Sequence, residues 1–190
     1  MPYIQNSLGF LVETVLGLYV LVILLRLVFQ YCGADHRNPL SVLIIRFTEA
    51  PLGVFRKIIP RMFGVDMACF VFALAVSMIQ LALVIGVSGY SLNIAAIALL
   101  ALSDILSTLV WIVIIAILAA AIMSWFMRSY HPVLFLAVQI SQPVLRPIRH
   151  IMPTIGGLDL SPIVAFFMLN LILRLVVAPI GDFGRLLMLG

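Results

Sequence analysis

The sequence predicts an all-α membrane protein with four transmembrane helices, arranged as two tandem parallel hairpin repeats with amphipathic loop helices in the cytoplasm. Three observations support this fold class. Hydrophobic residues make up 65% of the 190 residues and charged residues only 9%, whereas about a quarter of a water-soluble domain is charged. Four apolar segments are long enough to cross a bilayer, which takes about 20 helical residues. Finally, two loops share one order of prolines, basic residues and an aspartate.

The four predicted spans follow one another along the whole chain. They cover about residues 8–29, 67–87, 103–127 and 160–180. No basic residue precedes the first span, which also contains Glu13, so we interpret it as a retained span rather than a signal peptide. A short apolar segment over 94–102 either extends the third span or lies at the membrane interface.

Basic residues orient these spans. The segment before the first span and the connection over 88–102 contain no Lys or Arg, whereas the other two loops are basic. The positive-inside rule therefore predicts that both basic loops lie in the cytoplasm and both termini outside. The basic residues of the two loops are Arg37, Arg46, Arg56, Lys57, Arg61, Arg128, Arg146 and Arg149.

An internal repeat divides the chain into two hairpins. Corresponding residues of the two basic loops are separated by a nearly constant number of positions, and both copies have the same orientation. We therefore predict a first hairpin repeat over 1–93 and a second over 94–190, related by an axis along the membrane normal. The pairs are Pro51 and Pro143 and Lys57 and Arg149 at an offset of 92, and Pro39 and Pro132 and Asp66 and Asp159 at 93.

Each basic loop contains an apolar run too short to span the bilayer, over 40–47 and 133–140. A proline at the start of each run suits the first turn of a helix, and Asn38 is a good cap. Thr48 and Ser141 then offer a new cap shortly before another proline. The pattern predicts a helix, a break and a second short helix that carries Arg or Lys and lies along the membrane surface.

These loops carry a resemblance to a known family. The second reads SQPVLRPIRHIMPTIGGLDLSPIV from Ser141, and the first reads TEAPLGVFRKIIPRMFGVDMA from Thr48. The second resembles the motif of the YggT (YlmG) family, and the first keeps its skeleton without the PIR and SP elements. Length, span number and duplication are also similar to bacterial members. The resemblance implies a protein of the bacterial cytoplasmic (inner) membrane linked to osmotic and potassium homeostasis, with relatives associated with cell division or with cytochrome maturation in plastids.

Basic loop residues are the first group of candidate site residues. Arg146 and Arg149, with Thr154, Gly156 and Gly157, could cradle a phosphate or an anionic lipid. The alternative, which we favour, is that they anchor the cytoplasmic face of the protein. The predicted contacts to anionic lipids or partner proteins are Arg56, Lys57, Arg146 and Arg149.

Acidic and hydroxyl residues at the starts of two spans form the second group. Asp66 and Asp159 precede the second and fourth spans, and Ser161 begins a Ser-Pro pair. A carboxylate at such a position accepts backbone N–H bonds and complements the helix dipole. We therefore interpret all three residues as helix caps rather than as ion ligands.

Polar residues inside the spans form the third group. Charges in a bilayer are unfavourable and normally face a partner or a cavity. We therefore expect Arg174 to pair with Glu13 or Asp104, either along an ion path or, as we favour, in a static bridge. Arg26, near the inner end of the first span, is expected to extend its charge to the interface. The predicted intramembrane polar cluster is Glu13, Gln80, Asp104, Asn170 and Arg174.

Function is constrained mainly by exclusion. No nucleophile–base pattern, phosphate-binding loop, dinucleotide motif or zinc-ligand spacing is present, so we expect a non-enzymatic protein without a cofactor or metal. Sparse basic residues between apolar runs argue against nucleic acid. They favour phospholipids as partners, together with membrane proteins or further copies of the chain. Two functions remain: influencing osmotic or ion homeostasis by conduction or transporter modulation, or acting as a scaffold or assembly factor that docks proteins and anionic lipids.

Overall fold

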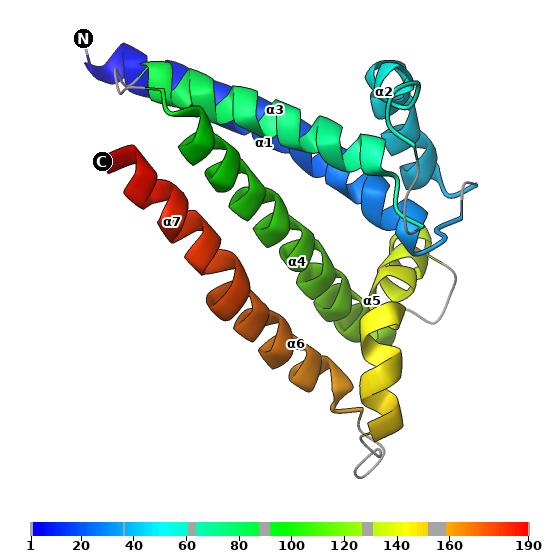
Figure 1. Cartoon of the computed structure of the whole chain (residues 1–190). Helices are drawn as coiled ribbons and strands as arrows, with labels where there is room; N and C mark the ends of the chain where they lie inside the picture. Colours follow the sequence, from blue (N-terminus) through cyan, green and yellow to red (C-terminus); the bar gives the residue numbers. More distant parts are fainter. Residues whose placement is uncertain are drawn as a thin grey trace.

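The computed structural model describes residues 2–35, 37–60, 64–87, 92–126, 131–151 and 159–189 (Figure 1). Within these ranges the chain is helical and contains no strand, which confirms the predicted all-α class. The helices are α1 (Pro2–Tyr31), α2 (Pro39–Phe55), α3 (Met67–Val87), α4 (Ile94–Phe126), α5 (Pro132–Ile151), α6 (Ser161–Ile172), the π-helix η1 (Leu173–Val177) and α7 (Ala178–Leu189).

Four helical segments are long and apolar enough to cross a membrane, as the sequence predicts. The second coincides with the predicted range, and the third begins at Ile94, so residues 94–102 extend that helix. The fourth continues past residue 180 through α6, η1 and α7. The segments are Ser7–Tyr31, Met67–Val87, Ile94–Ser124 and Ser161–Met188.

The spans form two pairs. Helix α1 packs along α3, and α4 packs along α7, while α3 and α4 join the pairs. Both termini lie at one end of the molecule, here called the terminal end, and α2 and α5 lie at the opposite end, the loop end (Figure 1). The α6–η1–α7 segment contacts only α4 and α5 among the other described helices. Much of the surface of the fourth span is therefore not covered by another described helix.

An apolar core fills the space between α1, α3 and α4. Cys69 lies in this core and donates its thiol proton to the Ile23 carbonyl at 3.3 Å, so α1 and α3 approach closely. Close packing of this kind, rather than release of water, drives helix association in lipid. Buried members of the core include Val20, Ile23, Leu24, Cys69, Phe72, Ala73, Val76, Ile105 and Ile112.

The predicted break in each loop helix is wrong. Helix α2 runs through Pro51, and α5 runs through Pro143 and Pro147. The expected caps instead donate hydrogen bonds within their own helices. The Thr48 hydroxyl donates to the Ile44 carbonyl at 2.7 Å, and the Ser141 hydroxyl donates to the Val138 carbonyl at 3.0 Å. Each helix also buries one face at helical spacing against the bundle. Such tertiary packing outweighs the hydrogen bond that a proline removes.

The expected cap at Asn38 is confirmed and has a second role. Its side-chain oxygen accepts from the Leu40 N–H at 3.0 Å, which caps α2. Its amide nitrogen donates to the Pro132 carbonyl at 2.9 Å, at the first residue of α5. One buried side chain thus couples the starts of the two loop helices.

Two glycines allow α7 to approach α4. A Cβ atom at Gly181 would lie 2.8 Å from the Ser103 hydroxyl oxygen. A Cβ atom at Gly184 would lie 3.0 Å from Leu100 Cγ and 3.2 Å from the Leu100 backbone nitrogen. Because backbone cannot move aside as a flexible side chain can, the contact at Gly184 has little room for even one methyl group.

We predict that Gly184→Ala destabilises the protein by about 1–3 kcal/mol, the usual effect of overpacking. Gly86→Ala is the matched control, because a Cβ atom there meets nothing within 4 Å and alanine favours a helix. Thermal unfolding in detergent measures both. Equal or higher stability of Gly184→Ala would contradict the close α4–α7 contact.

Candidate functional site

The most elaborate polar site lies at the loop end of the first hairpin and is built on Arg26. This arginine is only 3% exposed. Its guanidinium donates to the Ile45 carbonyl at 3.3 Å, to the Thr48 hydroxyl at 2.7 Å and to the Glu49 carboxylate. The expectation that Arg26 extends to the interface is therefore wrong. Helix α2 folds back over α1 and supplies the acceptors where the arginine lies.

A second arginine extends this site. Arg56 Nε and Nη2 donate to Asp66 Oδ2 at 2.9 and 2.7 Å, and Arg56 Nη1 donates to Glu49 Oε1 at 3.2 Å. Glu49 thus bridges both arginines. The two cations and two anions, Arg26, Glu49, Arg56 and Asp66, are here called the charge cluster, and their formal charges balance.

The same arginine–aspartate pair recurs in the second hairpin. Arg149 Nε donates to Asp159 Oδ2 at 2.9 Å, and Arg149 Nη2 forms a salt bridge with the same oxygen at 2.8 Å. Arg56 and Asp66 each stand 93 positions before their counterparts, so the ion pairs align Arg56, rather than Lys57, with Arg149. The surroundings differ, because the Asp66 side chain is 3% exposed and that of Asp159 is 38% exposed.

The predicted caps adopt two different arrangements. The Asp66 backbone carbonyl accepts from the first turn of α3, but its carboxylate pairs with Arg56 instead of capping the helix. Asp159 Oδ1 accepts from the Ser161 N–H at 3.0 Å and from its hydroxyl, so Ser161 is a donor to Asp159. Burial alone would raise the pKa of Asp159, but hydrogen bonds from Ser161 and Arg149 hold it below its ordinary value.

The four predicted lipid or partner contacts separate into two kinds. Arg56 and Arg149 are held in the ion pairs described above, whereas Lys57 and Arg146 are exposed. Within the described ranges, neither Lys57 nor Arg146 forms a salt bridge. The rest of the predicted phosphate cradle, Thr154, Gly156 and Gly157, lies outside the described residues.

The predicted intramembrane polar residues do not converge on the centre of the bundle. Glu13, Asp104 and Arg174 are all exposed on its outer surface. Gln80 donates to the Glu13 backbone carbonyl at 3.3 Å, and Asn170 donates within its own helix. This arrangement corrects the expected pairing of Arg174, because no carboxylate among the described residues lies within ion-pairing distance of it. Arg174 lies in η1, on a face that turns away from α4.

We predict unequal effects from breaking the two equivalent ion pairs. Arg56→Gln leaves Asp66 buried without its partner and should destabilise the protein by about 3 kcal/mol. Arg149→Gln breaks a half-exposed ion pair and should lower the stability of the folded protein by less than about 1 kcal/mol. Unfolding of both variants in the same detergent tests this, and equal losses would contradict the difference in burial.

We also predict a pH dependence that originates at Glu49. The hydrogen bond from Arg26 lowers the pKa of this carboxyl. A lowered folded-state pKa contributes stability above the unfolded value, about 4.3, and this contribution is lost as the pH falls through the folded value. The melting temperature should therefore fall as the pH drops from 5 to 3, and less steeply in Glu49→Gln. Parallel profiles for the two proteins would rule out this contribution.

Comparison with known proteins places this architecture in a family. The CCB3/YggT family model matches the chain twice, over residues 5–87 and 99–180. A protein called "Uncharacterized protein YggT" in Escherichia coli strain K12 is 32% identical over 98% of this chain and 97% of its own length. An uncharacterized Vibrio alginolyticus protein is 33% identical over 93% of this chain and 98% of its own. An uncharacterized Pseudomonas aeruginosa protein is 38% identical over 88% and 87%.

No solved structure matches the chain. The double match of the family model includes both arginine–aspartate pairs, the first two apolar spans and most of the other two. The relatives also cover nearly the full length of the chain. The protein therefore belongs to the CCB3/YggT family.

Proposed function

We propose that the protein is a non-enzymatic scaffold of the bacterial inner membrane that binds another membrane protein inside the bilayer. Through that partner it influences osmotic or ion homeostasis, by modulating a transporter rather than by conducting ions. The observation that carries this proposal is the outward position of Glu13, Asp104 and Arg174 on helices long and apolar enough to span a membrane.

The depth of these three charges supports a protein partner. Counted at about 1.5 Å per residue from the terminal end of each spanning helix, Glu13, Asp104 and Arg174 lie about 9, 15 and 21 Å along the helix. A charge at the middle of a spanning helix is unfavourable by about 2.5–3.5 kcal/mol on insertion scales. A neighbouring helix with a carboxylate opposite Arg174 would remove this penalty.

The interior of the bundle supports modulation over conduction. Apolar side chains of α1, α3 and α4 pack together between the charge cluster at the loop end and the outer polar residues. Ile23, Leu24 and Ile105 in this layer are completely buried. A water-filled ion path would need polar groups or water in this layer.

The loop end supports contact with the inner leaflet. Helices α2 and α5 expose apolar side chains such as Leu43, Phe47 and Ile151, and Lys57 and Arg146 are exposed on the same end. Apolar side chains beside cations are the pattern by which a helix lies on an anionic membrane surface. In this orientation the loop end is cytoplasmic and both termini face outward.

We predict that Arg174→Leu abolishes recovery of a specific membrane partner. The test is photocrosslinking from position 175 in cells, followed by purification and mass spectrometry. Arg185→Leu is the matched control, because Arg185 lies further along the same span and already pairs with Asp182. A partner that remains after Arg174→Leu, or potassium flux through liposomes containing this protein alone, would contradict the proposal.

A further inference from the structure

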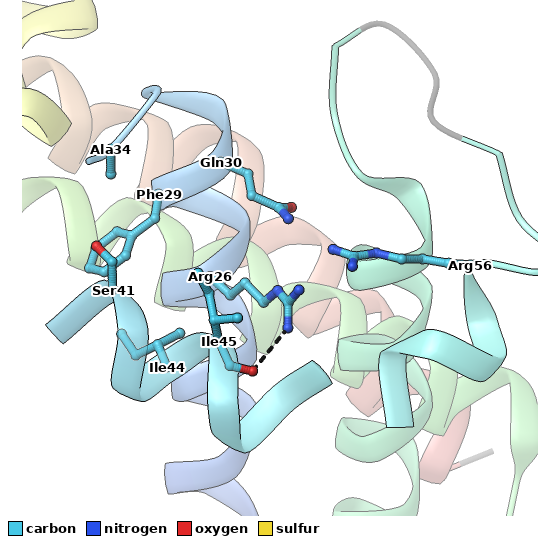
Figure 2. Close-up of a pocket in the computed structure, with 8 residues that line it drawn as sticks. All are labelled: Arg26, Phe29, Gln30, Ala34, Ser41, Ile44, Ile45 and Arg56. Carbon is cyan, nitrogen blue, oxygen red and sulfur yellow. Dashed lines mark hydrogen bonds between the residues drawn. The ribbon is translucent and has the colours of Figure 1, made fainter. Parts of the chain in front are cut away.

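A cavity of about 210 Å³ lies between α1 and α2 beside the charge cluster (Figure 2). Its polar wall consists of Arg26, Gln30, Ser41 and Arg56. Figure 2 shows the Arg26 guanidinium bonded to the Ile45 carbonyl, with the Arg56 side chain approaching from the other side. The cavity is therefore bordered by two guanidinium groups, an amide and a hydroxyl.

Two buried donors on this wall have no hydrogen-bond partner among the residues that the structure describes. They are Arg26 Nε and the Ser41 hydroxyl, on residues only 3% and 2% exposed. A buried polar group without a partner is unfavourable by about 1–3 kcal/mol, so natural proteins rarely leave one unmet. Arg26 and Ser41 both line the cavity, so a ligand with several acceptor oxygens can accept from both groups. An arginine favours a phosphate oxygen.

An apolar groove adjoins this cavity. It has a volume of about 360 Å³, lies between the two hairpins, and is lined by side chains of α1, α2, α4 and α5. Phe29 and Ile44 line both the groove and the polar cavity, so the two spaces share a wall. Ala119 and Ala137 line the groove, and their small side chains leave room along it. A polar cavity beside an apolar groove matches a molecule with a polar head and a hydrocarbon chain.

We propose that this is a binding site for one glycerophospholipid. The phosphodiester lies in the cavity and accepts from Arg26 Nε and the Ser41 hydroxyl, and one acyl chain lies in the groove. Because α2 lies at the loop end, the site is at the depth of lipid headgroups. A free phosphate would leave the groove empty, and a diacylglycerol would leave both donors unmet.

The described part of the second hairpin has no equivalent site. The positions 93 residues after Arg26 and Ser41 are Ala119 and Leu134, which donate no side-chain hydrogen bond. A larger cavity there is bordered by Arg149, but none of its described lining residues carries a buried donor without a hydrogen-bond partner. The proposal therefore requires one lipid per chain, and it stands independently of the proposed function.

Native mass spectrometry of the full chain in detergent tests the site with three probes. Dioctanoyl phosphatidylglycerol carries both a phosphate and acyl chains, dioctanoylglycerol lacks the phosphate, and glycerol phosphate lacks the chains. We expect one phosphatidylglycerol per chain, bound at least ten-fold more tightly than either fragment. Equal binding of glycerol phosphate would identify a soluble-phosphate site, and equal binding of dioctanoylglycerol an apolar groove only; either result overturns the proposal, as does no binding at all.

Two variants locate the lipid. Ser41→Ala should bind phosphatidylglycerol about five-fold more weakly, the loss of about one hydrogen bond, without lowering the melting temperature of the lipid-free protein. Ala119→Phe fills the groove and should also weaken binding. Ser103→Ala is the matched control, because its buried hydroxyl donates to the Val177 carbonyl far from the cavity. Unchanged affinity in Ser41→Ala and Ala119→Phe would overturn the assignment.

Discussion

The buried guanidinium of Arg26 is the constraint on which the loop end of this protein depends. A cation inside an apolar bundle must be surrounded by acceptors. The carbonyl, hydroxyl and carboxylate that surround Arg26 all come from one stretch of α2. Helix α2 therefore cannot move away from α1 without exposing an unpaired charge to lipid. The position of Glu49 follows from this contact, and Glu49 in turn binds Arg56, which reaches Asp66 at the start of α3.

The spans were predictable because apolar length is a local property of the sequence. The second span matched to the residue, and the resemblance of the loops to one family was confirmed by the comparisons. The role of Arg26 was not predictable in this way, because an arginine near a helix end can either reach water or bind a folded-back helix. Only the position of α2 decides between these outcomes. The spacing of Arg26 and Glu49 along the chain, 23 residues, gives no local signal.

The loop helices show a second limit of local patterns. Thr48 and Ser141 stand before prolines and suit a cap by residue type, yet both lie inside continuous helices. The buried faces of these helices, against the bundle, decide the outcome. The close packing of α7 was also missed, because Gly181 and Gly184 favour no structure until a partner helix is placed beside them. The outward turn of Arg174 likewise depends on which face of the fourth span packs against α4.

The π-helix η1 determines which residues of α7 face α4. A π turn holds one residue more than an α turn, so the chain after it is rotated by about 100° relative to an uninterrupted α-helix. Gly181 and Gly184 follow η1 and face α4, while Ala165 and Leu169 precede it and are also buried. If η1 became an α turn with its length unchanged, the glycines would turn away from α4 and bulkier side chains would take their place. A deletion of a single residue between 173 and 177 would instead remove the extra residue together with the wide turn, and the glycines would still face α4. The contact of α7 with α4 therefore depends on the wide turn and the extra residue together, and a change in only one of them would break it.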